Sequence, residues 1–222
     1  MPWQESTLNV LIVFAHPEPA SFSGALKDTA IETLGALGHD VEVSDLYADR
    51  FQPAGGPGDF THQVAAPFDY LAEQRNATAG GSSSATILRE QQKLMRADLL
   101  MFNFPMWWFG TPAILKGWID QVLAAGFAYD RDSRFETGRF RGKRGMLTVT
   151  TGSLGDRYTK DGPLAYAPMQ ETLHPLHRGV FEYIGLTVLE PFIAYGVSRA
   201  SEAERKAQLD AYSLHLTHQI AG

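Results

Sequence analysis

Three short segments of the 222-residue chain combine hydroxyl, glycine and large aromatic residues in a way that could hold a ligand. They are HPEPASFS (16–23), PMWWFG (105–110) and TTGSLGDRY (150–158). Each follows a run of apolar and β-branched residues that predicts a buried strand. In an open parallel sheet, ligands bind beyond the carboxyl ends of the strands. The three segments therefore predict one shared ligand site.

The first segment leads directly into a predicted helix. Free backbone N–H groups and the helix dipole favour phosphate at such a position, and His16, Ser21 and Ser23 can add donors. The competing interpretation is a helix cap with an incidental histidine. The chain has neither a lysine-bearing phosphate loop nor G-x-G-x-x-G after the first strand. Their absence argues against a nucleoside triphosphatase or a fingerprint-type dehydrogenase.

The second and third segments suit a flat ligand. Trp107, Trp108 and Phe109 can form a wall for an aromatic ring system, although a hydrophobic plug or a subunit contact would explain them as well. The glycines of the third segment let backbone N–H groups approach a ligand closely. The alternative there is a plain glycine-rich turn, with Tyr158 as an ordinary exposed aromatic.

The elements that must position these segments alternate between strand and helix. The expected strands are 8–15, 41–45, 98–104, 145–151 and 186–190, and the expected helices are 21–37, 85–97, 112–125, 168–184 and 201–220. Parallel strands need such helical crossovers, so the pattern predicts a flavodoxin-like, doubly wound α/β domain with a five-stranded parallel sheet. The stretch 50–84 fits neither period, and we expect a partly flexible, irregular insertion within a single domain spanning 1–222.

Composition restricts the possible functions. The net charge of −6 argues against general nucleic-acid binding. The absence of cysteine excludes disulfides, thiolate catalysis and cysteine-based metal sites, so redox chemistry would need a cofactor. The first basic residue is Lys27 and the apolar run 10–15 is too short to cross a bilayer, so we expect a cytoplasmic protein without a membrane span. The pairs His174/His177 and His215/His218 are interpreted as surface or structural residues, and no metal is expected.

Several stretches together resemble the NAD(P)H:quinone oxidoreductase (DT-diaphorase-like) family of flavodoxin-like flavoproteins. They are AHPEPASFSGALKD (15–28), SDLYA (44–48), EQQKLMRADLLMFNFPMWWFGTPAILKGWID (90–120), GFAY (126–129), VTTGSLGDRY (149–158) and LEP (189–191). They occur in family order and cover most of the chain. The stretch FPMWWFGTPAILKGW is the most specific of them.

The resemblance implies a homodimer that binds FAD at the three segments, each site being completed by the other subunit. Some bacterial relatives use FMN instead. NAD(P)H would give a hydride to the flavin and leave, and a quinone or similar aromatic acceptor would then take the same place, in a two-electron ping-pong reaction. The alternatives are a nitro- or azo-compound reductase and a flavin-binding regulatory subunit of a potassium-efflux system.

The resemblance also assigns roles to individual residues. Cofactor contacts are implied for His16, Ser21, Phe22, Ser23, Ala25, Pro105, Met106, Trp107, Trp108, Phe109, Thr150, Thr151, Gly152, Ser153, Tyr158 and Arg205. Catalysis is implied for Tyr158, Gly152 and Ser153, which would face the negative charge of the reduced flavin. The implied substrate pocket contains Trp108, Tyr129, Tyr183 and Arg199.

The chain departs from the family at several of these positions. A histidine that relays a proton in animal members aligns with Leu164, and a second pocket histidine aligns with Arg199. The metal-binding histidines of one branch align with Arg178 and Glu182, so that metal site is not expected. The preference among NADH, NADPH and a shorter nicotinamide donor stays open.

Overall fold

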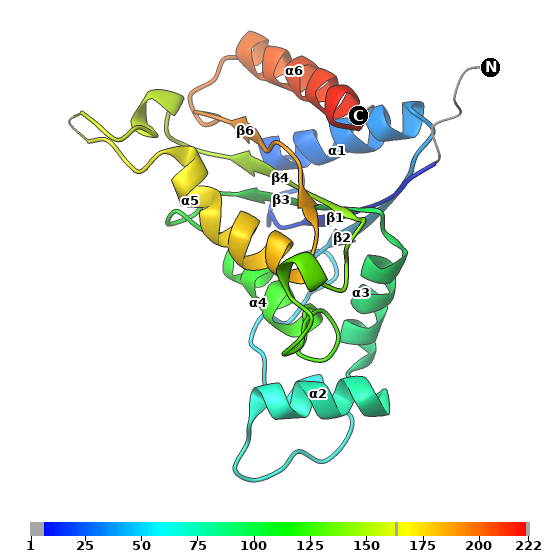
Figure 1. Cartoon of the computed structure of the whole chain (residues 1–222). Helices are drawn as coiled ribbons and strands as arrows, with labels where there is room; N and C mark the ends of the chain where they lie inside the picture. The colour runs from blue at the N-terminus through cyan, green and yellow to red at the C-terminus, as the bar shows by residue number, and fades with distance from the viewer. Residues whose placement is uncertain (1–6, 163, 221–222) are drawn as a thin grey trace.

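The computed structural model describes residues 7–162 and 164–220, which form a sheet of parallel strands with helices on both faces (Figure 1). The strand order is β2-β1-β3-β4-β5, and β6 also pairs with β4. The strands are β1 (Asn9–Phe14), β2 (Asp40–Asp45), β3 (Leu99–Pro105), β4 (Arg144–Thr150), β5 (Thr187–Val188) and β6 (Phe192–Ala194). The predicted doubly wound α/β sheet is confirmed.

The helices divide into two layers. Helices α1 (Phe22–Ala36) and α6 (Glu202–Ile220) cover one face of the sheet, and α3 (Ala85–Arg96), α4 (Ala113–Val122) and α5 (Met169–Leu176) cover the other (Figure 1). Leu26 of α1 and Tyr212 of α6 are fully buried in the first layer, and Trp118 of α4 in the second. Strands β1 and β3 lie between both layers, which explains their nearly continuous apolar sequences.

The register of the strands brings the ends of β1, β3 and β4 together. Phe14 of β1 lies opposite Asn103 of β3, and Pro105 of β3 lies opposite Thr150 of β4. The backbone N–H of Met106 then donates to the carbonyl of Thr150 over 2.8 Å. The segments that follow these strands therefore start from one edge of the sheet, as the sequence predicts.

The fifth strand and the helix before it differ from the prediction. Residues 186–190 were expected to form one strand, but the edge is split into β5 and β6 around Pro191, which has no N–H to donate to a sheet ladder. The helix expected over 168–184 is α5 followed by a π-helical turn, His177–Glu182. Pro175 lies inside α5 and removes one backbone donor just before the change of helix type.

The expectation of an irregular insertion at 50–84 is wrong in part, because this stretch contains a 3₁₀ turn (Pro57–Asp59) and the helix α2 (Tyr70–Gly80). Asp69 caps α2 by accepting from the N–H of Ala72, and Gly81 ends it in a left-handed conformation. These capping residues are a sequence signal that could have predicted the helix. Gln74 ties α2 to the end of α4, since it donates to the carbonyl of Asp120 over 2.8 Å and accepts from the N–H of Ala125 over 3.0 Å.

Candidate functional site

The loop before α1 is held by its own side chains. The N–H of Glu18 donates to His16 Nδ1 over 3.0 Å, and the carboxylate of Glu18 accepts from the N–H of Ala20 over 2.9 Å. Ser21 is the helix cap and accepts from the N–H of Gly24 over 3.1 Å. Among the described residues, the N–H groups of Phe22 and Ser23 have no hydrogen-bond partner. The first turn of α1 therefore offers free donors to an anion.

The side chain of Ser23 does not point toward such an anion. It is buried, and its hydroxyl lies 2.9 Å from that of Thr150 at the end of β4. Ser23 and Thr150 thus fasten the first loop to the third, and either residue would reach a ligand through its backbone. Phe22 packs on the apolar cluster beneath α1, and Ala25 is half-buried beside it.

The aromatic segment after β3 makes a tight turn that turns its rings outward. The backbones of Trp107 and Gly110 exchange hydrogen bonds of 3.1 and 3.0 Å. Trp108 and Phe109, at the tip, have φ values of 50° and 58°, a left-handed conformation that is uncommon for bulky residues. Trp108 is 97% exposed. The competing interpretation of these rings as a buried hydrophobic plug is therefore wrong within one subunit.

The third loop places Tyr158 beside the second. Its hydroxyl lies 3.8 Å from the sulfur of Met106, and its ring packs against Tyr195 at 5.5 Å between centroids. Burial raises the pKa of the Tyr158 phenol, and a hydrogen bond with Thr151 opposes this more weakly. The phenol therefore stays protonated at neutral pH and remains a donor. The N–H groups of Gly152 and Ser153 also lack partners in the described part of the chain.

Tyr166 is a site residue that the sequence reasoning missed. Its hydroxyl lies 3.3 Å from that of Ser153, and its ring meets Phe109 edge-on at 5.0 Å and Tyr158 at 5.3 Å. Tyr166 thus connects the second and third loops. The segment around it has no strand or helix period, so only a three-dimensional contact could reveal this role. Leu164, which aligns with the relay histidine of the animal members, is 76% exposed.

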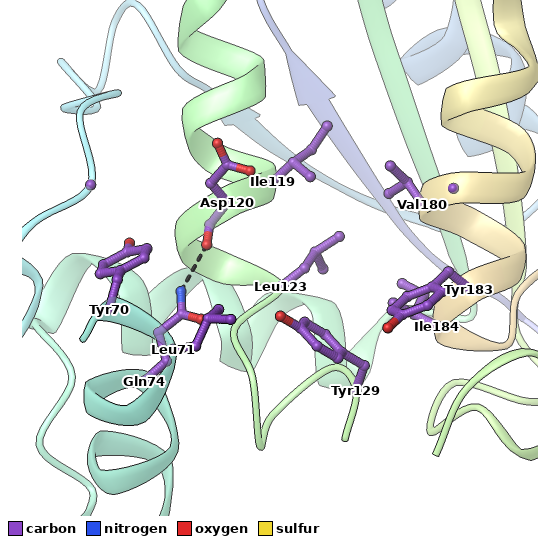
Figure 2. Close-up of a pocket in the computed structure, with 12 residues that line it drawn as sticks. Tyr70, Leu71, Gln74, Ile119, Asp120, Leu123, Tyr129, Val180, Tyr183 and Ile184 are labelled. Atoms are coloured by element: carbon purple, nitrogen blue, oxygen red, sulfur yellow. Dashed lines mark hydrogen bonds between the residues drawn. The ribbon is translucent and has the colours of Figure 1, made fainter. Parts of the chain in front are cut away.

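The four predicted substrate residues fall into three places. Tyr129 and Tyr183 meet with ring centroids 5.4 Å apart and line a cavity of about 460 Å³ between α2, α4 and the π-helical turn (Figure 2). We call this cavity the tyrosine slot; Tyr70 and Asp120 also line it. Trp108 and Arg199 are not among its lining residues: Trp108 is at the tip of the aromatic turn, and Arg199 lies in the exposed segment after β6.

Arg205 lies in the first turn of α6, where the backbone holds its guanidinium. It donates to the carbonyls of Val197 over 3.1 Å and Ala200 over 3.2 Å. The N–H of Val197 in turn donates to the carbonyl of Thr151. Arg205 is thereby linked to the third loop through one intervening residue, close to the other predicted cofactor residues.

Comparison with known proteins agrees with this arrangement. A family model described as a flavodoxin-like fold matches residues 8–216. The chain is 42% identical over 209 residues to a mouse (Mus musculus) protein named ribosyldihydronicotinamide dehydrogenase [quinone], covering 93% of this chain and 90% of that protein. The chain belongs to the flavodoxin-like family.

Two further relatives of this flavodoxin-like chain support the same assignment. It is 39% identical to rat (Rattus norvegicus) NAD(P)H dehydrogenase [quinone] 1 over 208 residues, covering 93% of this chain and 75% of the rat protein. A crystal structure from Klebsiella pneumoniae, described as a candidate quinone reductase, superposes with a TM-score of 0.90 at 39% identity. That match covers 95% of this chain and 84% of the Klebsiella chain. The resemblance seen in the sequence motifs is confirmed.

Two classes of feature are not found in the described residues of this flavodoxin-like chain. Over residues 7–162 and 164–220, no group of three or more histidine, aspartate or glutamate side chains is arranged to hold a metal ion. Within the same ranges, no helix is both long enough and apolar enough to cross a membrane.

Proposed function

We propose that the chain is an NAD(P)H:quinone oxidoreductase that carries FAD at the three loops. The observation that carries the proposal is the convergence of free helix N–H groups, an outward aromatic turn and a protonated tyrosine at one edge of the sheet. The names of the relatives, which specify quinone dehydrogenases, support the choice of acceptor.

The residues present fit a flavin. The first turn of α1 would hold its phosphates, because the N–H groups of Phe22 and Ser23 are unpaired and the helix dipole favours negative charge, and His16 would add a ring nitrogen. Trp107 and Phe109, about half exposed, would cover the ring system. Gly24 keeps the loop close to the helix, since a Cβ there would lie 1.9 Å from the carbonyl oxygen of Pro19.

A bound flavin would supply the hydride chemistry that this cysteine-free chain lacks. The chain's own part is to bind, to orient and to stabilise charge. The Tyr158 phenol and the N–H groups of Gly152 and Ser153 are donors whose hydrogen bonds would strengthen as negative charge develops. Tyr166 would hold Ser153 and Phe109 in place for this purpose.

We also propose that two copies of the chain form the working enzyme. Trp108 is almost fully exposed, and so large an apolar side chain at a site suggests a covering partner. The tyrosine slot is lined by residues other than those of the loops. In the homodimer, the slot of one subunit would lie over the loops of the other, so that Tyr129 and Tyr183 complete the partner's substrate pocket.

The experiment is an anaerobic titration of the purified protein. We expect yellow protein that bleaches with NADH, NADPH or dihydronicotinamide riboside and recovers its absorbance when benzoquinone is added. Heat release followed by chromatography identifies FAD or FMN, and light scattering gives the oligomeric state. Protein that binds flavin but is reduced by none of the three donors would overturn the proposal, and nitro and azo acceptors tested in parallel define the acceptor class.

A further inference from the structure

A strongly basic segment follows Tyr129 in a chain whose net charge is −6. Residues 131–144 contain six basic side chains and two acidic ones, Asp132 and Glu136. The six basic residues are Arg131, Arg134, Arg139, Arg141, Lys143 and Arg144. A cluster of positive charge in a chain with a negative net charge indicates either a structural role for these side chains or an anionic partner.

Two of these cations have structural roles. Lys143 caps the C-terminal end of α3, because its Nζ donates to the backbone carbonyls of Met95 and Ala97, each over 2.6 Å. Arg139 approaches Asp130 at 4.0 Å, and Arg75 of α2 approaches the same carboxylate at 3.7 Å. These contacts account for Lys143 and Arg139 within the fold.

Three other arginines have no such role. Arg131, Arg134 and Arg141 are exposed, and no carboxylate of the described residues lies within ion-pair distance of them. The guanidinium of Arg134 donates to the backbone carbonyl of Arg131 over 2.6 Å, and that of Arg141 donates to the backbone carbonyl of Glu136 over 3.4 Å. Their charges remain available to a ligand.

The segment is anchored beside the tyrosine slot. The ring of Phe135 meets that of Tyr183 edge-on, with 5.2 Å between the centroids. The guanidinium of Arg178 lies over the same Phe135 ring, 4.1 Å from its centroid. Asp130, which follows Tyr129 directly, draws Arg75 toward the slot from α2. The basic segment therefore runs beside the aromatic slot, and none of the slot's described lining residues is itself a cation.

We propose that Arg131, Arg134 and Arg141 bind the phosphate groups of a dinucleotide hydride donor whose nicotinamide ring lies against Tyr129 and Tyr183. The inference rests on the proposed function, including its dimer. Aromatic rings favour a flat ring system and guanidinium groups pair with phosphate oxygens, so the combination fits a ligand with both parts. The relatives are named for donors with and without such phosphates. The arginines favour NADPH and NADH over the riboside.

The test compares donors on a charge-reduced variant of the holoenzyme. In Arg131→Gln/Arg134→Gln/Arg141→Gln, we expect kcat/KM for NADPH to fall about tenfold at low salt, mainly through KM. The dependence on ionic strength should flatten, because fewer charges are left to screen. With dihydronicotinamide riboside, which has no phosphate, kcat/KM should be unchanged. Calorimetric titration with NADP⁺ should show a matching loss of affinity.

The matched control removes the same number of charges elsewhere. Arg89→Gln/Arg96→Gln/Lys206→Gln lies on α3 and α6, and it should leave all three donors unaffected. An equal loss with the riboside and NADPH, or no loss with either, would overturn the inference. Wild-type activity with the riboside but not with NADPH or NADH would also overturn it, while the proposed quinone reduction would stand. Failure of every donor on the wild type would instead overturn the proposed function.

Discussion

The two parts of the candidate site are built in different ways. The three loops depend on the ends of adjacent strands and on local backbone hydrogen bonds, such as those between Trp107 and Gly110. The tyrosine slot depends on side chains from separate elements, among them Tyr70 of α2 and Tyr183, which directly follows the π-helical turn. The loops are therefore set largely by local backbone contacts, whereas the slot depends on how separate elements pack together. Substitutions in each part should separate cofactor binding from donor binding.

The largest effect is expected at Tyr158. In Tyr158→Phe, the reduction of bound flavin by NADPH should slow about 10²-fold, because one preorganised donor to developing charge is lost. The flavin content should stay that of the wild type, since α1 and the aromatic turn are untouched. Stopped-flow measurement of the reductive half-reaction tests this. An unchanged rate would show that Tyr158 acts only in packing.

A next, smaller effect is expected at the start of α1. In Gly24→Ala, the added methyl group would overlap the carbonyl of Pro19, and we expect a loss of about 1–3 kcal/mol of stability together with weakened flavin binding. Gly35→Ala in the same helix is the control, because nothing lies within 4 Å of its added Cβ. Thermal unfolding and bound-flavin absorbance report both quantities. Equal behaviour of the two variants would contradict the tight approach at Gly24.

Tyr166 should show a weaker effect than Tyr158. Tyr166→Phe removes the hydroxyl contact with Ser153 and keeps the ring on Phe109. We expect a several-fold slower reductive step, corresponding to about 1 kcal/mol for one neutral hydrogen bond. Removing the ring in Tyr166→Ala should slow it further. If the two variants have the same rate, the hydroxyl has no part in positioning Ser153.

The smallest effect is expected in α2, and it should disappear as the pH falls into the acid range. Glu73 of α2 is buried, pairs with His62 over 2.6 Å, and accepts from the N–H of Ala65. The hydrogen bond from His62, followed by that from Ala65, lowers the pKa of the Glu73 carboxyl. Its contribution to stability is therefore complete above the ordinary glutamate pKa and is lost as the pH falls through the lowered one. The difference in Tm between wild type and Glu73→Gln should shrink over that range, and a constant difference would contradict this.

The capping and strand patterns explain why much of the fold could be predicted. Ser21 caps α1 and Pro112 precedes α4, as expected from local sequence. The break between β5 and β6 and the π-helical turn were missed, because each depends on how a proline is accommodated among packed neighbours. Helix α2 was missed because its sequence lacks a clear apolar period, although Asp69 and Gly81 marked its ends.

The candidate site, like the fold, could be predicted from the sequence only in part. Residues on the three loops could be named from sequence because they follow recognisable strands. The pairing of Ser23 with Thr150 joins residues 127 positions apart. The contact of Tyr166 with Phe109 joins two different loops. No local pattern reports contacts of this kind.

The sequence by itself determined the alternation of strands and helices, the absence of cysteine chemistry and the three loops at the strand ends. These follow from hydrophobic periodicity, composition and capping, which act over a few residues. Only the tertiary structure decided that Ser23 points inward, that Trp108 points outward and that Tyr129 meets Tyr183 beside the basic segment. Packing between distant segments sets those directions, and its energy depends on neighbours that the linear sequence does not place together.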